Sequence, residues 1–189
     1  RIEASYPTLL KGERLSLNIF QRMCGIATET AKYVKELKGT STELLDTRKT
    51  APGLRVLDKM AVKDGGGTNH RMGLYDMAMI KDNHIKMAGG ITKAVEQVRG
   101  NIPATIKIEV ETTNLAEVDE AIAAGADIIM LDKMDNATMA QAVATIKASG
   151  KAIKTEASGN MSIPRLVEVA ATGVDYISVG ALTHTVKGM

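Results

Sequence analysis

Residues 105 to 132 read TIKIEVETTNLAEVDEAIAAGADIIMLD, and this stretch decides the fold. It opens with an apolar run at 105–111, continues with apolar residues at helical spacing, and closes with a second apolar run at 127–132. The second run contains Ile-Ile-Met-Leu, which is apolar on both faces and typical of a strand covered on both sides. The order of strand, helix and strand predicts a βαβ unit with parallel strands.

The same alternation continues over the chain from Gly39 onward. Strands are expected at 42–46, 76–81, 105–111, 127–132, 152–157 and 175–179. The junctions 124–127 and 172–175 occupy the same place in two units, and each has a glycine suited to the left-handed residue that ends a helix. We therefore expect an α/β fold: an open, incomplete βα barrel of parallel strands, similar to a TIM barrel.

Three helices have recognisable features. Asn114 and Glu117 form a capping arrangement for one helix, and another begins at Ser162 with Pro164 in its first turn. Residues 14–38 predict a long helix whose apolar face covers the barrel or a partner subunit. That face carries Leu15, Ile19, Met23, Ile26 and Thr30.

Composition excludes several classes of protein. With 189 residues, 44% of them hydrophobic, the chain fits one globular domain. Its net charge of +2, its single Phe and its lack of Trp argue against nucleic-acid and polybasic membrane surfaces. The single cysteine, Cys24, excludes an internal disulfide, and no run approaches the ~20 apolar residues of a membrane helix. We expect a soluble, cytoplasmic protein without nucleic-acid or membrane partners.

Polar clusters follow the predicted strands at their carboxyl ends. They are Asp46-Thr47-Arg48-Lys49-Thr50, Lys81-Asp82-Asn83-His84, Glu109-Val110-Glu111, Leu131-Asp132, Glu156-Ala157-Ser158-Gly159-Asn160 and Ser178-Val179-Gly180-Ala181. Taken singly, the Arg-Lys pair reads as a solvated turn and the carboxylates as helix caps. Because parallel strands of a barrel deliver these ends to one face, we expect the clusters to form one site.

The residue types in this site indicate a strongly anionic ligand. Positive charge and bidentate donors for carboxylate or phosphate come from Arg48, Lys49, His70, Arg71 and Lys81. Glu111 and Asp132 can hold a divalent cation or sugar hydroxyls. The small Gly and Ser residues after the last two strands allow backbone N–H groups to approach a phosphate.

In this order, the clusters resemble the C-terminal barrel region of the quinolinate phosphoribosyltransferases, also called nicotinate-nucleotide pyrophosphorylases (carboxylating). The resemblance, which includes Asn69-His70-Arg71, covers about residues 12–187. It implies a Mg²⁺-dependent pentosyltransferase of NAD biosynthesis. Quinolinate and phosphoribosyl pyrophosphate would give nicotinate mononucleotide, pyrophosphate and CO2.

The resemblance also implies roles for single residues. The quinolinate carboxylates would be held by Arg48, His70, Arg71, Lys81 and, from the neighbouring subunit, Arg14. The catalytic groups would be Lys49 and Lys81 at the donor, and Glu111 and Asp132 at its ribose hydroxyls and Mg²⁺. The 5-phosphate would be bound by Ser158, Gly159, Asn160, Ser178, Val179 and Gly180, with His184 beside them; Thr50 completes the substrate-binding set.

The chain departs from the family pattern in two ways. Lys133 and Asn160 stand where many members have Asn and Gly. The family also has a preceding α+β domain, of which residues 1–13 are expected to be the tail, with 14–189 forming the barrel domain. The family's homodimers, or larger oligomers of dimers, are expected here too.

Three alternatives stay open at this point. A related phosphoribosyltransferase for nicotinate or another pyridine acid needs fewer carboxylate clamps. A Schiff-base aldolase would use Lys81 or Lys49. A truncated barrel would bind anions without turnover.

Overall fold

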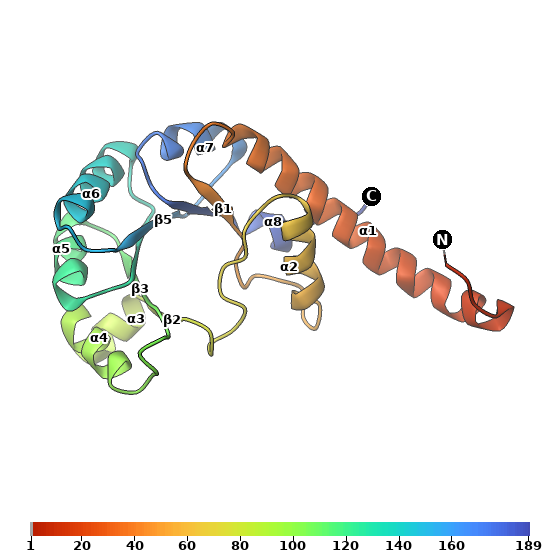
Figure 1. Ribbon diagram of the computed structural model, residues 1–189, viewed down its shortest axis with the longest axis horizontal. Helices are drawn as coiled ribbons and strands as arrows, with labels where there is room; N and C mark the ends of the chain where they lie inside the picture. The colour runs from red at the N-terminus through yellow and green to blue at the C-terminus, as the bar shows by residue number, and fades with distance from the viewer. Residues whose placement is uncertain (1) are drawn as a thin grey trace.

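The computed structural model describes residues 2–189 as an open barrel of parallel strands with helices on its outer side (Figure 1). Its strands are β1 (Glu43–Leu45), β2 (Ala78–Ile80), β3 (Ile108–Thr112), β4 (Ile128–Asp132), β5 (Lys154–Ser158) and β6 (Tyr176–Ser178). Their order is β1-β6-β5-β4-β3-β2, so the barrel is open between β1 and β2. The six predicted strands and the open parallel barrel are confirmed.

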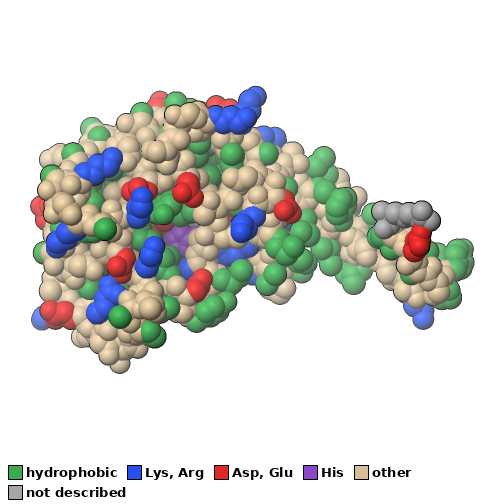
Figure 2. All heavy atoms as spheres, viewed as in Figure 1, with side chains coloured by type: hydrophobic (Ala, Val, Ile, Leu, Met, Phe, Trp, Pro, Cys, Tyr) green, Lys and Arg blue, Asp and Glu red, His purple; other side chains and the backbone are tan. Residues whose placement is uncertain are grey.

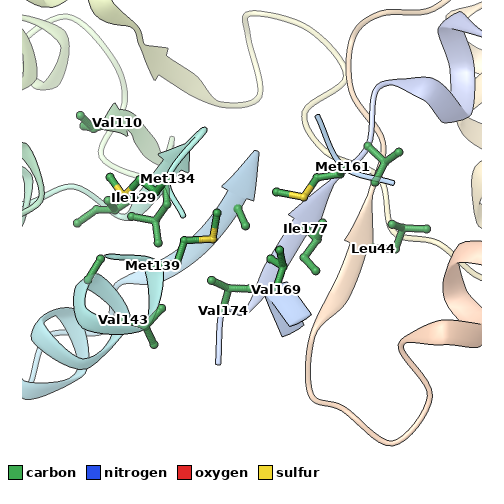
Figure 3. Close-up of a cluster of buried hydrophobic side chains, with 14 of the residues drawn as sticks. Leu44, Val110, Ile129, Met134, Met139, Val143, Met161, Val169, Val174 and Ile177 are labelled. Atoms are coloured by element: carbon green, nitrogen blue, oxygen red, sulfur yellow. The ribbon is translucent and has the colours of Figure 1, made fainter. Parts of the chain in front are cut away.

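Helices follow the strands, and all of them except the short α3 contribute buried side chains. They are α2 (Arg55–Asp64), α3 (Asp82–Ala88), α4 (Ile91–Arg99), α5 (Leu115–Ala124), α6 (Asn136–Ala148), α7 (Ile163–Ala170) and α8 (Ala181–His184). Ile129 of β4 packs in the core with Met139 and Val143 of α6, and Ile177 of β6 lies in the same core (Figure 3). The helix starts predicted near Asn114 and Ser162 are confirmed, since these residues are the N-caps of α5 and α7.

Strand alternation sends one set of side chains outward and the other into the barrel. In β4, the outward side chains Ile129 and Leu131 are fully buried under helices. Met130 and Asp132, one residue out of phase, line the cavity inside the barrel. The polar side chains of the site therefore belong to the set that points into the barrel.

The repeated junctions hold neighbouring strands together. Gly125 is the C-cap of α5 and has a φ of 80°. Gly173, which follows the end of α7, has a φ of 85°. Two residues further on, Asp127 accepts a hydrogen bond from the Ile108 N–H, and Asp175 accepts one from the Thr155 N–H. Each aspartate thus joins the start of its strand to the preceding strand along the chain.

The first helix, α1 (Tyr6–Glu36), begins eight residues before the predicted start at residue 14. Its second half packs on the barrel, where Ile26 and Thr30 are fully buried. Its first half projects away from the barrel (Figure 1), and Leu15 there is 66% exposed. The helix runs without a break across residues 13 and 14, and the domain division at that point stays a prediction. Within residues 2–189, no helix is both long and apolar enough to cross a membrane.

Candidate active site

The carboxyl ends of the strands surround one cavity of about 470 Å³. Figure 2 shows acidic and basic side chains gathered on one face of the barrel, with a histidine among them. Most of the predicted site residues line this cavity: Arg48, Lys49, His70, Arg71, Lys81, Glu111, Asp132, Ser158, Gly159, Asn160, Ser178, Gly180 and His184. Strand ends that are distant in sequence therefore meet around one space.

One part of the wall is cationic. Arg48 and Lys49 follow β1, and Lys81 follows β2. Arg71 is 8% exposed, and its guanidinium donates to the Met77 carbonyl at 3.1 Å. Burial, followed by the nearby Arg48, lowers the pKa of Arg71. Guanidinium groups crowded in this way favour an anionic ligand, because an anion relieves their repulsion.

The acidic part of the wall is formed by Glu111 and Asp132. Glu111 pairs with Lys81 at 2.9 Å, and Asp132 pairs with Lys133 at 3.2 Å. Both carboxylates keep about a seventh of their surface open to the cavity, with side-chain exposures of 15% and 14%. Carboxylate oxygens are the ligands that Mg²⁺ prefers, together with water and phosphate oxygens, so this donor set fits Mg²⁺.

The loop after β5 approaches the end of β4 closely. The Lys133 N–H donates to the Ser158 carbonyl at 3.0 Å. A Cβ on Gly159 would lie 2.6 Å from Cγ of Lys133, and Gly159 has a φ of 96°. Glycine is needed here for both conformation and space. The contact holds the Ser158–Asn160 turn against Asp132.

Three predicted residues do not line the cavity. Thr50 accepts a hydrogen bond from Nε of Arg55 and lines a separate shallow pocket with Pro52 and Gly53. Val179 is 2% exposed, and its N–H donates to the Leu45 carbonyl at 3.0 Å, which leaves no amide hydrogen for a phosphate. Arg14 is exposed on the projecting half of α1.

His70 lines the cavity and also contacts buried groups behind it. Its Nδ1 accepts a hydrogen bond from the Arg71 N–H at 2.8 Å. Its Nε2 lies 3.1 Å from an oxygen of Glu109 and 3.1 Å from an oxygen of Glu156, and both carboxylates are buried. Nδ1 is engaged within the protein, whereas Nε2 lies between the two carboxylates without an aligned hydrogen bond to either.

The hydrogen bond to Nδ1 places the ring proton of His70 on Nε2, which faces the two carboxylates. Burial lowers the pKa of His70, but the two carboxylates outweigh it and raise that pKa. Burial and the neighbouring Glu156 raise the pKa of Glu109 to about 7. Among the described residues, these are the only three His, Cys, Asp or Glu side chains whose ligand atoms all lie within 4.8 Å of one another. A metal on Nε2 requires a proton on Nδ1, however, and Nδ1 is a hydrogen-bond acceptor here.

Sequence reasoning placed Asp46, Glu109 and Glu156 in the polar clusters of the site but gave them no role, and it missed Lys59. The two glutamates carry a usable signal, because each is a charged residue inside an otherwise buried strand and must therefore have a partner. Lys59 carries none, since a lysine in an amphipathic helix is normally solvated.

Comparison with known families matches residues 26–189 to the C-terminal domain of quinolinate phosphoribosyl transferase. The chain belongs to this family. A relative in Synechocystis, named as a carboxylating nicotinate-nucleotide pyrophosphorylase, is 53% identical over 92% of this chain and 59% of its own length. A relative of the same name in Bacillus subtilis is 48% identical over 96% of this chain and 62% of its own length.

Solved structures of the quinolinate phosphoribosyl transferase family share the fold. NadC from Streptococcus pyogenes has a TM-score of 0.91 at 42% identity, covering 98% of this chain and 64% of its own. The nicotinate-nucleotide pyrophosphorylase of Francisella tularensis has a TM-score of 0.90 at 48% identity, covering 97% of this chain and 64% of its own. The chain spans less than two thirds of the length of each of these relatives.

Proposed function

We propose that this protein transfers the phosphoribosyl group of phosphoribosyl pyrophosphate to quinolinate, with loss of CO2. The observation that carries the proposal is the cavity wall itself. Arg48, Lys49 and Arg71 face the same space as Glu111 and Asp132. The cations suit the carboxylates of quinolinate and the phosphates of the donor, while the carboxylates suit the ribose. Membership in the quinolinate phosphoribosyl transferase family supports the same substrates.

The charges fit the bond changes of this reaction. The pyridine nitrogen attacks the anomeric carbon as the bond to pyrophosphate breaks, and positive charge develops on the ribose ring. One carboxylate about 4 Å from that charge contributes on the order of 4 kcal/mol at an effective dielectric near 20. Glu111 and Asp132 are the groups assigned to this role. Arg48, Arg71 and Lys81 orient quinolinate, so that much of the rate acceleration is positioning.

Glu111 and Asp132 would also hold Mg²⁺. When bound, Mg²⁺ neutralises charge on the departing pyrophosphate. Lys49 would bind the phosphates of the donor. Loss of CO2 then follows from the chemistry of the product: the electron pair of the broken C–C bond stays on the ring carbon, where the adjacent positively charged nitrogen stabilises it, and a solvent proton adds to that carbon. This sequence needs no covalent nucleophile from the protein.

The proposed working unit is a homodimer, or a larger oligomer of dimers, in the cytoplasm. The projecting half of α1 carries exposed apolar residues, including Leu10 (54% exposed) and Phe20 (64%). Packing against a partner would bury them. Arg14 lies on this half of α1 and would reach the partner's cavity as a further carboxylate clamp. The single, unpaired Cys24 fits a reducing compartment.

A turnover assay beside calorimetric titration tests the proposal. The purified protein with Mg²⁺ is expected to convert quinolinate and phosphoribosyl pyrophosphate into nicotinate mononucleotide, followed by chromatography. Lys49→Ala should weaken donor binding by about tenfold or more, because it removes a charge-assisted contact worth about 1.5–3 kcal/mol. Unchanged donor affinity would contradict the role of Lys49.

Other outcomes of the same experiments identify the alternatives. Binding of both ligands without any product would indicate an anion-binding barrel. Turnover of nicotinate but not of quinolinate would indicate a related phosphoribosyltransferase. A covalent adduct at Lys81 or Lys49 after borohydride treatment with a carbonyl compound would indicate Schiff-base chemistry.

A further inference from the structure

A buried ion pair lies behind the cationic wall. Asp46 follows β1 and is 0% exposed, and Lys59 lies in α2 and is 1% exposed. Oδ1 of Asp46 accepts a hydrogen bond from Nζ of Lys59. Neither residue lines the cavity. An apolar pair could fill the same space without the cost of desolvating two charges, so this pair is weak evidence for a role in fold stability.

The ion pair holds the segment Asn69–Arg71 from several sides. Asp46 accepts from the His70 N–H at 2.8 Å, and Lys59 donates to the His70 carbonyl at 3.0 Å. Nδ2 of Asn69 donates to Asp46 at 2.6 Å and to the Lys59 carbonyl at 2.8 Å. The backbone of His70 is therefore fixed at both its N–H and its carbonyl. Arg71, the next residue, places its guanidinium in the cavity wall.

Helix α2 fixes the other cationic loop by similar contacts. Arg55 donates to the Arg48 carbonyl at 3.3 Å and to the Met72 carbonyl at 3.2 Å. Asp58 accepts from the Ala51 N–H at 3.1 Å. One helix thus sets the spacing between the loop that carries Arg48 and the loop that carries Arg71.

We propose that Asp46 and Lys59 are positioning residues for quinolinate, which act by fixing the His70–Arg71 segment so that Arg71 meets a ring carboxylate. The inference rests on the proposed function. Within residues 2–189, neither side chain makes a hydrogen bond to the ends of β4 and β5. Asp132 and Ser158 lie at those ends. The direct hydrogen bonds of the pair go to the segment that carries Arg71, so its main effect falls on the quinolinate half of the site.

The decisive variant is Lys59→Met, which keeps the length of the side chain and removes its charge. Misplacing a clamp by about 1 Å can reduce activity about 100-fold, so the Kd and KM for quinolinate should rise about 10- to 100-fold. The Kd for phosphoribosyl pyrophosphate should stay at the wild-type value. Lys63→Met in the same helix is the matched control, because Lys63 is exposed, and it should change neither constant.

A second variant separates positioning from stability. Lys59→Met alone leaves Asp46 buried and unpaired, whereas Asp46→Asn with Lys59→Met removes both charges. The double variant should recover most of the Tm lost by Lys59→Met. Its affinity for quinolinate should stay low, because the hydrogen bond from Lys59 to His70 is still missing. Recovery of quinolinate affinity together with Tm would overturn the proposal.

A ligand-free measurement completes the test. The chain has three histidines, so protein labelled with ¹⁵N-histidine gives one backbone amide signal for each. The His70 amide should exchange faster with solvent in Lys59→Met, and those of His84 and His184 should not. A wild-type protein that binds no quinolinate refutes the proposed function. Wild-type quinolinate affinity in Lys59→Met, or an equal loss of donor affinity, refutes the positioning role alone.

Discussion

Two residues beside the cavity adopt a backbone conformation that favours glycine or asparagine. Lys133 has a φ of 54° and Asn160 has a φ of 50°, and no other non-glycine residue of the described chain has a positive φ. The left-handed region costs an ordinary L-residue roughly 1–2 kcal/mol, whereas Gly and Asn adopt it more readily. This cost gives a physical reason to expect Asn or Gly at these two positions.

Substitutions at Lys133 should therefore change stability in opposite directions. Lys133→Asn should raise the free energy of unfolding by about 0.5–1 kcal/mol, because asparagine tolerates the left-handed backbone. That gain corresponds to a rise in Tm of about 1–4 °C in a domain of this size. Lys133→Val should lower the free energy of unfolding, because a β-branched residue is strained there.

Urea unfolding of both Lys133 variants checks this prediction. The ion pair between Lys133 and Asp132 joins a lysine side chain that is 70% exposed, so its loss in both variants should change little. If Lys133→Asn and Lys133→Val changed stability by the same amount, the backbone explanation would be wrong.

At the scale of the elements, the aspartate that opens a strand stabilises the pairing of its neighbour. Asp175 accepts hydrogen bonds from the N–H and the hydroxyl of Thr155, both at 2.9 Å, and from Nζ of Lys154 at 2.6 Å. Burial alone would raise the pKa of Asp175. The contacts from Lys154 and Thr155 outweigh it, so that the pKa lies below its usual value of 3.8.

The pH dependence of Asp175→Asn follows from the direction of this shift. A lowered pKa in the folded state means that Asp175 contributes stability above pH ~4, and that this contribution is lost as pH falls through the folded-state pKa. At pH 7, Asp175→Asn should lower the free energy of unfolding by about 1.5–3 kcal/mol, the size of a hydrogen bond to a charged group. Urea unfolding should show a smaller difference between the two proteins near pH 3. A difference that grows on acidification would contradict this assignment.

The elements that could be predicted from sequence are those with a local signal. The strand at 128–132 is apolar on both faces, and the junction glycines at 125 and 173 mark helix ends, so both could be placed in advance. The start of α1 was misplaced because residues 6–13 lie on the projecting part of the helix. They are exposed or half-exposed and show no buried stripe to set a period.

The residues of the candidate site also differ in whether the sequence could predict them. Inward residues at strand ends, such as Lys81 and Asp132, follow from the order of strands and polar clusters. The partners of His70 do not, because Lys59 reaches it from a helix and Glu109 and Glu156 reach it from two other strands. Such contacts depend on how the barrel curves, and this curvature cannot be predicted from the residues of one short segment.

At the scale of the whole molecule, the barrel and the projecting half of α1 differ in how much apolar surface they expose. Figure 2 shows hydrophobic side chains gathered along the projecting helix. Leu10, Leu17 and Phe20 are spaced by seven and three residues, so they lie on one face, and each is at least 45% exposed. A second copy of the chain would bury this face and bring Arg14 to another cavity, which is the dimer proposed above.

Mixing two inactive variants tests this arrangement without changing the fold of either. Arg14→Ala removes the clamp that a subunit lends to its partner, and Lys49→Ala removes a group from the subunit's own cavity. Each variant alone should have low activity. In a dimer with one copy of each, one cavity has both Lys49 and the partner subunit's Arg14.

If subunits exchange freely, the mixture should recover about a quarter of wild-type activity, because half the dimers are mixed and half their cavities are complete. No recovery after verified exchange would mean that Arg14 acts within its own subunit or not at all, and a wild-type monomer in light scattering would refute the dimer.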